Sequence, residues 1–116
     1  MKSPSPTAPA LTQAMQLILM SLLAGDRHGY AIMLEIESLT DGAVRVGPAT
    51  LYTSIKKMLD ARLIEESGER PDAQIDDERR RYYRLTGAGR AAVAAETRRL
   101  EKLVRYASPL LRMGAA

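Results

Sequence analysis

Hydrophobic residues return every three or four positions in the first quarter of the chain, which is the spacing of an amphipathic helix. The pattern covers residues 10–24, and its apolar positions are Leu11, Met15, Ile18 and Leu22. Gly25 ends this helix, and Asp26 is placed to cap a second helix that begins near residues 28–30. That second helix carries a similar stripe and ends at the Asp-Gly pair of residues 41–42. Two successive core helices are therefore expected.

A third apolar stripe begins after Pro48, a residue suited to the first turn of a helix. Its members are Leu51, Ile55, Met58 and Leu59, and the helix is expected to end near residue 62. Residues 63–64 then form a short apolar pair, residues 67–78 are polar, and residues 79–85 are rich in tyrosine. This order predicts two antiparallel strands that form a hairpin with a long tip.

Thr86 is placed to cap a final helix. Its apolar positions keep close to a heptad spacing, and they are Val93, Leu100, Leu103, Val104 and Ala107. Pro109 cannot donate a backbone hydrogen bond and biases Ser108 away from the helical conformation, so the regular helix is expected to span residues 86–107. An apolar seam on an otherwise charged helix predicts that a second copy of the chain covers it.

Composition places the chain among ordinary globular proteins. It has 116 residues, 46% of them hydrophobic and 27% charged, which fits one domain whose core a dimer would enlarge. Residues 15–24 could also be the apolar part of a secretory signal, but their helical spacing favours a core helix, and the segment is too short to span a bilayer. We therefore expect no membrane partner. The absence of cysteine excludes disulfides and fits a cytoplasmic location.

The sequence offers little for catalysis. His28 is the only histidine, and it stands at a helix start with no cysteine nearby, so we expect it to cap or pack rather than bind a metal or act as a nucleophile. Gly29 is not part of a glycine-rich phosphate loop, and no paired carboxylates stand out from the solvated acids. We expect no enzymatic activity, no cofactor and no metal.

Charge is unevenly distributed along the chain, although the net charge of +3 only permits a nucleic-acid partner. Residues 45–62 hold a single acid, Asp60, against the cations Arg45, Lys56, Lys57 and Arg62. Residues 65–78 hold seven acids against Arg70. Because DNA phosphates repel acids, the third helix and the basic returning strand are expected to approach DNA, and the hairpin tip is not.

Three separated motifs carry a resemblance to a known family. They are HGY at residues 28–30, TLY at residues 50–52 with a trailing Leu-Ile, and YYRLTGAGR at residues 82–90. In this order and spacing the chain resembles the PadR family of bacterial transcriptional regulators over about residues 15–105. It departs from the usual family pattern at Ala49, where glycine is common, and at Thr53, where proline is common. Both lie on the third helix, so the operators of other members do not transfer.

The resemblance and the element order together predict a mainly α fold. We expect a winged helix-turn-helix with a two-stranded antiparallel wing and a coiled-coil-like C-terminal dimerisation helix. Residues 1–9 are expected to form a flexible N-terminal arm, residues 10–85 the DNA-binding domain, and residues 86–116 the dimerisation helix and tail.

A reading helix meets DNA with one face only if its opposite face is anchored in a core, and the apolar stripe of residues 51–59 is that anchor. The residues expected to contact DNA lie on this helix and on the returning strand: Pro48, Ala49, Thr50, Tyr52, Thr53, Lys56, Lys57, Arg79, Arg80, Arg81 and Arg84. Two alternatives stay open. The helix face could be merely solvated, and Arg80 and Arg84 could pair with glutamates 65 or 66 across the hairpin.

The predicted function is sequence-specific binding to double-stranded DNA by a homodimeric repressor on a palindromic operator. The family resemblance further implies release by a ligand or partner. A small apolar or aromatic effector is predicted to lie among Met15, Leu19, Leu100 and Tyr106, unless the dimer core is closed and holds no ligand. The alternative function is a protein–protein adaptor that keeps the winged fold but uses its last helix and acidic wing, since fold does not fix function.

Overall fold

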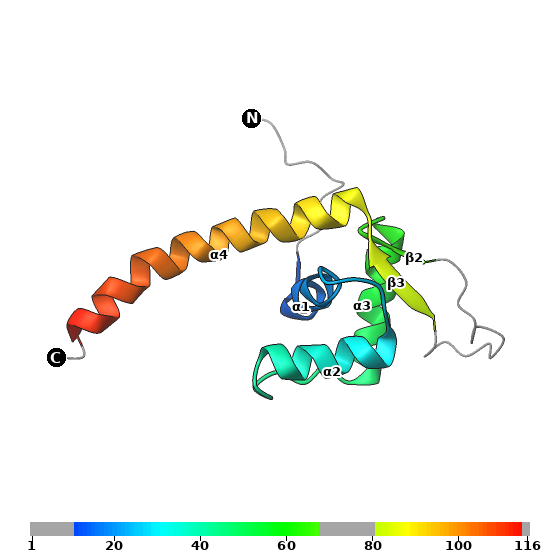
Figure 1. Ribbon diagram of the computed structural model, residues 1–116, viewed down its shortest axis with the longest axis horizontal. Helices are drawn as coiled ribbons and strands as arrows, with labels where there is room; N and C mark the ends of the chain where they lie inside the picture. Colours follow the sequence, from blue (N-terminus) through cyan, green and yellow to red (C-terminus); the bar gives the residue numbers. More distant parts are fainter. Residues whose placement is uncertain (1–10, 68–80, 115–116) are drawn as a thin grey trace.

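The computed structural model describes residues 11–67 and 81–114 of the chain. The elements follow in the order α1 (Gln13–Ser21), β1 (Arg27–His28), α2 (Gly29–Leu39), α3 (Pro48–Asp60), β2 (Ile64–Glu66), β3 (Tyr82–Leu85) and α4 (Gly87–Gly114). The first three helices and the sheet form a compact body, and α4 extends well beyond it (Figure 1). The predicted mainly helical class is confirmed. The predicted arm at residues 1–9 and the tip of the hairpin lie outside the described residues.

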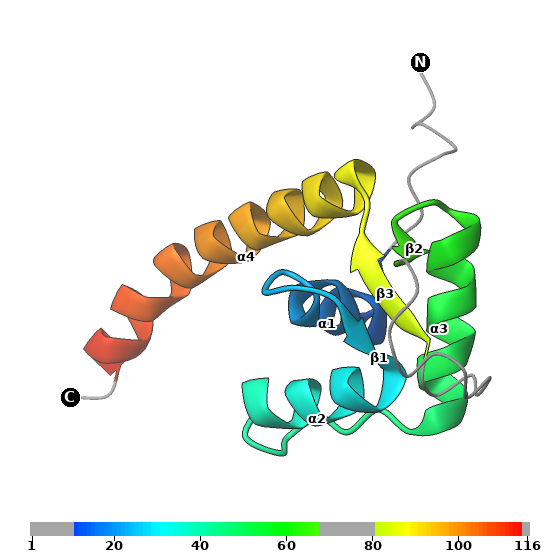
Figure 2. The ribbon, with the colours of Figure 1, turned by 45° about the vertical axis from the view of Figure 1, so that its right-hand side comes forward.

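The core surrounds α1, which lies between α4 on one side and α2 on the other (Figure 2). Its buried side chains come from every helix and from the sheet, and include Met15, Ile18, Leu19, Leu22, Ile32, Ile36, Leu51, Met58, Tyr83 and Val93. Complete burial of such a side chain stabilises the fold by about 1.5–3 kcal/mol. None of the helices within the described residues has the length and apolar character needed to cross a membrane.

Helix α1 is shorter than the predicted span of residues 10–24. Thr12 caps its start, where Oγ1 accepts a hydrogen bond from the Met15 amide at 3.1 Å. At the other end, the Arg27 Nε donates to the Ser21 carbonyl at 2.7 Å, and this satisfies an acceptor that a longer helix would have used itself. The side chain of Arg27 therefore helps to end the helix where it does.

The cap of α2 is His28, and the prediction for Asp26 is wrong. His28 Nδ1 accepts a hydrogen bond from the Ala31 amide at 3.2 Å, and its ring meets Tyr82 edge-on at 5.4 Å. The chain is still extended before this point because Arg27 and His28 form β1, so α2 begins only at Gly29. The expectation that His28 caps or packs is confirmed.

The predicted antiparallel pair of strands is confirmed as β2 and β3. Within the described residues the sheet has a third strand that was not predicted, β1, and the order is β1-β3-β2. Both pairings are antiparallel, and the register places Ile64 opposite Leu85 and Arg27 opposite Tyr83. Strand β1 has only two residues, which is too short to produce a visible alternation of apolar and polar positions. In β3, by contrast, the side chains alternate, because Tyr83 is buried and Arg84 is exposed.

Helix α4 starts as predicted and ends later than predicted. The Thr86 hydroxyl accepts a hydrogen bond from the Gly89 amide at 3.0 Å, which confirms the cap. The helix then passes through Pro109 to Gly114, although it was expected to end at residue 107. Proline removes one hydrogen bond, to the carbonyl four residues earlier, and its fixed φ is compatible with a helix. On an exposed helix water replaces that bond, and the helix curves along its length instead of ending (Figure 1).

Candidate nucleic-acid interface

Helix α3 divides into a buried and an exposed face. Leu51, Ile55 and Met58 are buried and Leu59 is half-buried, so the predicted anchor is confirmed. The opposite face consists of small, hydroxyl-bearing and cationic residues that are all exposed: Pro48, Ala49, Thr50, Thr53, Lys56 and Lys57. The structure therefore brings these predicted residues together on one surface, supported by the core.

The ends of α3 fix how this surface is presented. Gly47 is the N-cap and Pro48 occupies the first turn, where its missing amide is no loss. At the other end Arg62 adopts a positive φ of 62°, and the Leu63 amide donates to the Met58 carbonyl at 2.9 Å. This closing turn directs the chain straight into β2.

The exposed face of α3 carries positive charge that the rest of the described chain leaves largely unpaired. Arg45, just before the helix, pairs with Glu37 at 3.7 Å. Lys56 and Lys57 are exposed and have no ion-pair partner among residues 11–67 and 81–114. Such a face suits phosphate oxygens, and the hydroxyls beside the lysines suit hydrogen bonds to base edges.

Tyr52 does not belong to this face, contrary to the prediction. It is half-buried, packs against the core, and its hydroxyl is buried. The ring lies against Gly29 at the start of α2, where a Cβ atom would approach Cζ of Tyr52 to 3.0 Å and overlap its hydroxyl oxygen. The HGY and TLY motifs are therefore joined by one contact: the glycine leaves the space that the tyrosine fills.

We expect Gly29→Ala to lower the free energy of unfolding by about 1–3 kcal/mol, because the added methyl group overpacks the contact with Tyr52. Denaturant unfolding followed by circular dichroism measures the change. In a Tyr52→Leu background the ring is gone, so the same substitution is expected to cost much less. Equal costs in the two backgrounds would mean that the two residues do not interact.

The arginines of the returning strand are held by acids on β2. Arg84 stands opposite Glu65 and pairs with it at 2.8 Å, and Arg81 pairs with Glu66 at 3.3 Å. The alternative of cross-strand pairing is thus observed for Arg84, while Arg79 and Arg80 lie outside the described residues. Because both ion pairs are about half exposed, each stabilises the hairpin by only about 0–1 kcal/mol. Exchanging a glutamate for a phosphate would therefore cost little.

The predicted seam residues of α4 separate into two groups. Val93 is only 1% exposed and belongs to the core of the single chain, so it is not available to a partner. It is buried because the first turns of α4 still cover α1 and the sheet. Leu100, Leu103 and Val104 are exposed and Ala107 is partly exposed, on the stretch of α4 that leaves the body.

The predicted effector residues do not come together in the chain. Met15 and Leu19 are in the core, whereas Tyr106 is 73% exposed on the extended part of α4. Leu100 lines a different space, a groove of about 390 Å³ between α1 and α4 that also includes Leu17 and Met20. The predicted α1 residues, Met15 and Leu19, lie on the side of the helix that faces the core.

The same groove is bordered by an exposed ion pair on α4. The Arg99 Nε donates a hydrogen bond to Glu96 Oε1 at 3.0 Å. This hydrogen bond lowers the pKa of Glu96 and raises the pKa of Arg99. The pair sits one helical turn apart on an exposed surface, so it adds little to stability.

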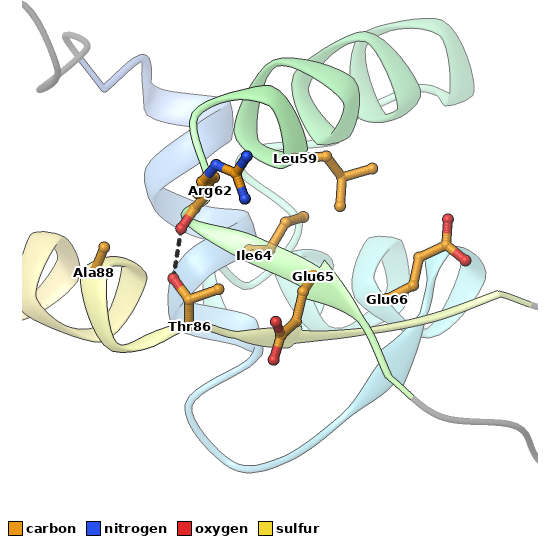
Figure 3. Close-up of a pocket in the computed structure, with 7 residues that line it drawn as sticks. All are labelled: Leu59, Arg62, Ile64, Glu65, Glu66, Thr86 and Ala88. Atoms are coloured by element: carbon orange, nitrogen blue, oxygen red, sulfur yellow. Dashed lines mark hydrogen bonds between the residues drawn. The ribbon is translucent and has the colours of Figure 1, made fainter.

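A contact that was not predicted from the sequence links the end of α3 to the start of α4. The Thr86 side chain points at the end of α3 and donates a hydrogen bond to the Arg62 carbonyl at 2.6 Å, as Figure 3 shows. It borders a groove of about 490 Å³ that Leu59 and Ala88 also line. In the next turn a Cβ on Gly89 would overlap the carbonyl oxygen of Leu63. Helices α3 and α4 thus meet through close backbone contacts, with no space for an added methyl group at Gly89.

Comparisons with known proteins agree with this architecture. The family described as "Transcriptional regulator PadR-like family" matches residues 18–95. A transcriptional regulator of Mycobacterium tuberculosis is 37% identical over 80 residues, which cover 68% of this chain and 57% of that protein. The matched parts of the curated relatives amount to 57% and 66% of their own lengths.

Solved structures share the fold. A transcriptional regulator from Clostridium thermocellum superimposes with a TM-score of 0.66 at 24% identity, covering 83% of this chain and 87% of its own. A PadR family transcription regulator from Clostridium difficile gives a TM-score of 0.62 at 21% identity, covering 90% of this chain and 100% of its own. The three motifs, the winged arrangement and the family match over residues 18–95 lead to one conclusion: the chain belongs to the PadR-like family of transcriptional regulators.

Proposed function

We propose that this protein binds DNA sequence-specifically as a homodimer and represses transcription by occupying an inverted-repeat operator. One observation carries the proposal: α3 presents an exposed face of hydroxyls and lysines on a largely buried apolar anchor, and these lysines have no ion-pair partner among the described residues. Residues 10–85 form the DNA-binding domain in this proposal, and residues 86–116 supply the dimer contact.

The side chains on α3 fit the two tasks of an operator-binding helix. Lys56 and Lys57 reach for phosphates and hold the helix in register, while the hydroxyls of Thr50 and Thr53 lie where base edges would be read. Ala49, beside them, is small and leaves room for close approach to the bases. With Tyr52 turned inward, base discrimination depends on the two threonines.

The exposed apolar residues of α4 support the homodimer. Past Val93 the helix exposes a continuous series of large apolar side chains: Leu100, Leu103, Val104, Tyr106, Leu110, Leu111 and Met113. A patch of this kind marks a protein contact, and a two-fold axis through it would place two α3 helices on successive half-sites. An effector remains a prediction from the family resemblance, and the proposed function does not depend on one.

Selection from random duplexes tests the proposal. We expect enrichment of an inverted repeat whose half-site centres lie about one helical turn, or a multiple of it, apart. Placing that sequence over a promoter should lower transcription when the protein is added. Uniform weak binding to every duplex, with no enriched repeat, would contradict sequence-specific function.

Lysine substitutions separate phosphate contacts from base reading. Lys56→Ala and Lys57→Ala are each expected to weaken binding to all duplexes and to flatten the dependence of log affinity on log salt by about 0.9 per protomer, because each removes one phosphate contact. Thr50→Ala should change the preferred base instead. Lys102→Ala, an exposed lysine on α4, is the matched control. If it flattens the salt dependence equally, the contact is not specific to α3.

A further inference from the structure

A groove runs between the first turn of α1 and the exposed face of α3. Its volume is about 390 Å³, and its lining residues are Thr12, Ala14, Ala49, Thr50, Thr53, Ser54 and Lys57. Helix α1 was not among the elements expected to meet DNA. The groove nevertheless shares four exposed residues with the face of α3 described above, so the two surfaces are continuous.

The first turn of α1 offers a backbone donor at this groove, the amide of Ala14. Thr12 already serves two of the first amides: its Oγ1 accepts from Met15, and its carbonyl accepts from Gln16 at 2.9 Å. The amide of Ala14, which lines the groove, precedes any intrahelical acceptor. It has no acceptor within the described part of the chain. Free amides at the positive end of a helix favour an anion.

Ser54 gives an independent indication of a ligand. It is only 7% exposed, it lines the groove, and its hydroxyl has no hydrogen-bond partner among the described residues. The oxygen keeps access to the groove, and a serine within a helix often bonds its own backbone instead. Ser54 does not, so an acceptor entering the groove would complete its hydrogen bonding.

The charge of the groove selects the kind of ligand. Lys57 contributes an ammonium group that is free of ion pairs in the described residues, and no acidic side chain lines the groove. Hydroxyls, an amide and an ammonium group together supply donors to several oxygens of one anion. A phosphate group has that chemistry.

We propose that this groove binds one phosphate of the DNA backbone in each half-site, beside the major groove that α3 enters. The inference rests on the proposed DNA-binding function and adds α1 and Ser54 to the contact surface. Free inorganic phosphate has the same chemistry. DNA is the inferred source because the groove opens directly onto the reading face of α3.

Methylphosphonate scanning tests the proposal with the full chain and the selected operator. Replacing one charged phosphate oxygen by methyl is expected to cost about tenfold in affinity at one position per half-site that this groove binds. In Ser54→Ala and Lys57→Ala that local penalty should shrink to less than about twofold. Lys56→Ala is the matched control, since Lys56 is exposed on the same helix but does not line the groove. It should weaken binding overall and keep the penalty.

The outcomes distinguish this inference from the function on which it rests. If the wild type selects an operator but the penalty persists in both groove variants, the phosphate site is overturned and DNA binding stands. If no operator is selected, both fail. Titration of the DNA-free protein with inorganic phosphate adds a second readout, the amide NMR signal of Ala14. Strong shifts there, without any methylphosphonate penalty, would assign the groove to a free anion and overturn the DNA assignment.

Discussion

We expect that replacing Leu103 and Val104 together by glutamate converts the proposed dimer to a monomer and lowers the affinity for a two-half-site operator by about a hundredfold or more. These side chains are 50% and 59% exposed on the part of α4 that leaves the body. In the proposed dimer they are buried against a partner, and an unpaired carboxylate there is strongly unfavourable. Sedimentation velocity measures the mass, and fluorescence anisotropy measures the binding.

A charge-matched variant shows whether the effect comes from the seam. Arg98→Glu changes the net charge by as much as the double substitution, and it lies on the opposite side of α4, where the arginine is exposed. It should remain a dimer. A wild type that is already monomeric at micromolar concentration and yet binds the full operator tightly would contradict the homodimer.

The periodic part of the fold was predictable from sequence. In α3 the apolar residues repeat at helical spacing over the whole element, so the buried anchor and most of the exposed face were assigned correctly. Tyr52 is the exception, because its position on the helix is intermediate and its direction is decided by Gly29, which lies far away in the sequence. Local spacing does not contain that tertiary contact.

Other differences have the same origin. Val93 and Leu103 look alike in the heptad pattern, because a protein core and a dimer seam both use apolar residues. A residue of α4 can contact a partner only where the helix has left the body. The packing of α4 against α1 determines where that point lies. Strand β1 forms only because β3 pairs with it. Helix α4 continues past Pro109 because an exposed helix tolerates one missing backbone hydrogen bond. None of these causes is local.

The groove beside Ser54 shows the same limit at the candidate site. The sequence predicted DNA contacts on α3 and on the returning strand, since those segments are basic. The first turn of α1 carries no cation, and its contribution consists of a backbone amide. A site built from an amide and a buried hydroxyl leaves no charge pattern in the sequence. The site is recognisable only in the structure, where α1 and α3 lie side by side.

The glycine in the last motif is expected to be the most sensitive position for folding. Gly89→Ala would place a methyl group on the carbonyl oxygen of Leu63, so either α4 or the end of α3 must move. The neighbouring atom belongs to the backbone and is fixed by the link from Thr86 to the Arg62 carbonyl, and no flexible side chain gives way. We expect a loss of about 3 kcal/mol or more in the free energy of unfolding, which is a large share of the stability of a small domain.

Gly87→Ala is the control that isolates this contact, because it makes the same chemical change two residues earlier in the same turn. A Cβ at Gly87 meets nothing within 4 Å, so it gains helix propensity, by up to about 1 kcal/mol, without any clash. The two variants should therefore shift the denaturation midpoint in opposite directions. If the Gly89 variant unfolds at the same denaturant concentration as the wild type, α3 and α4 are not in rigid contact. In that case α4 could not set the spacing of the two α3 helices in the proposed dimer.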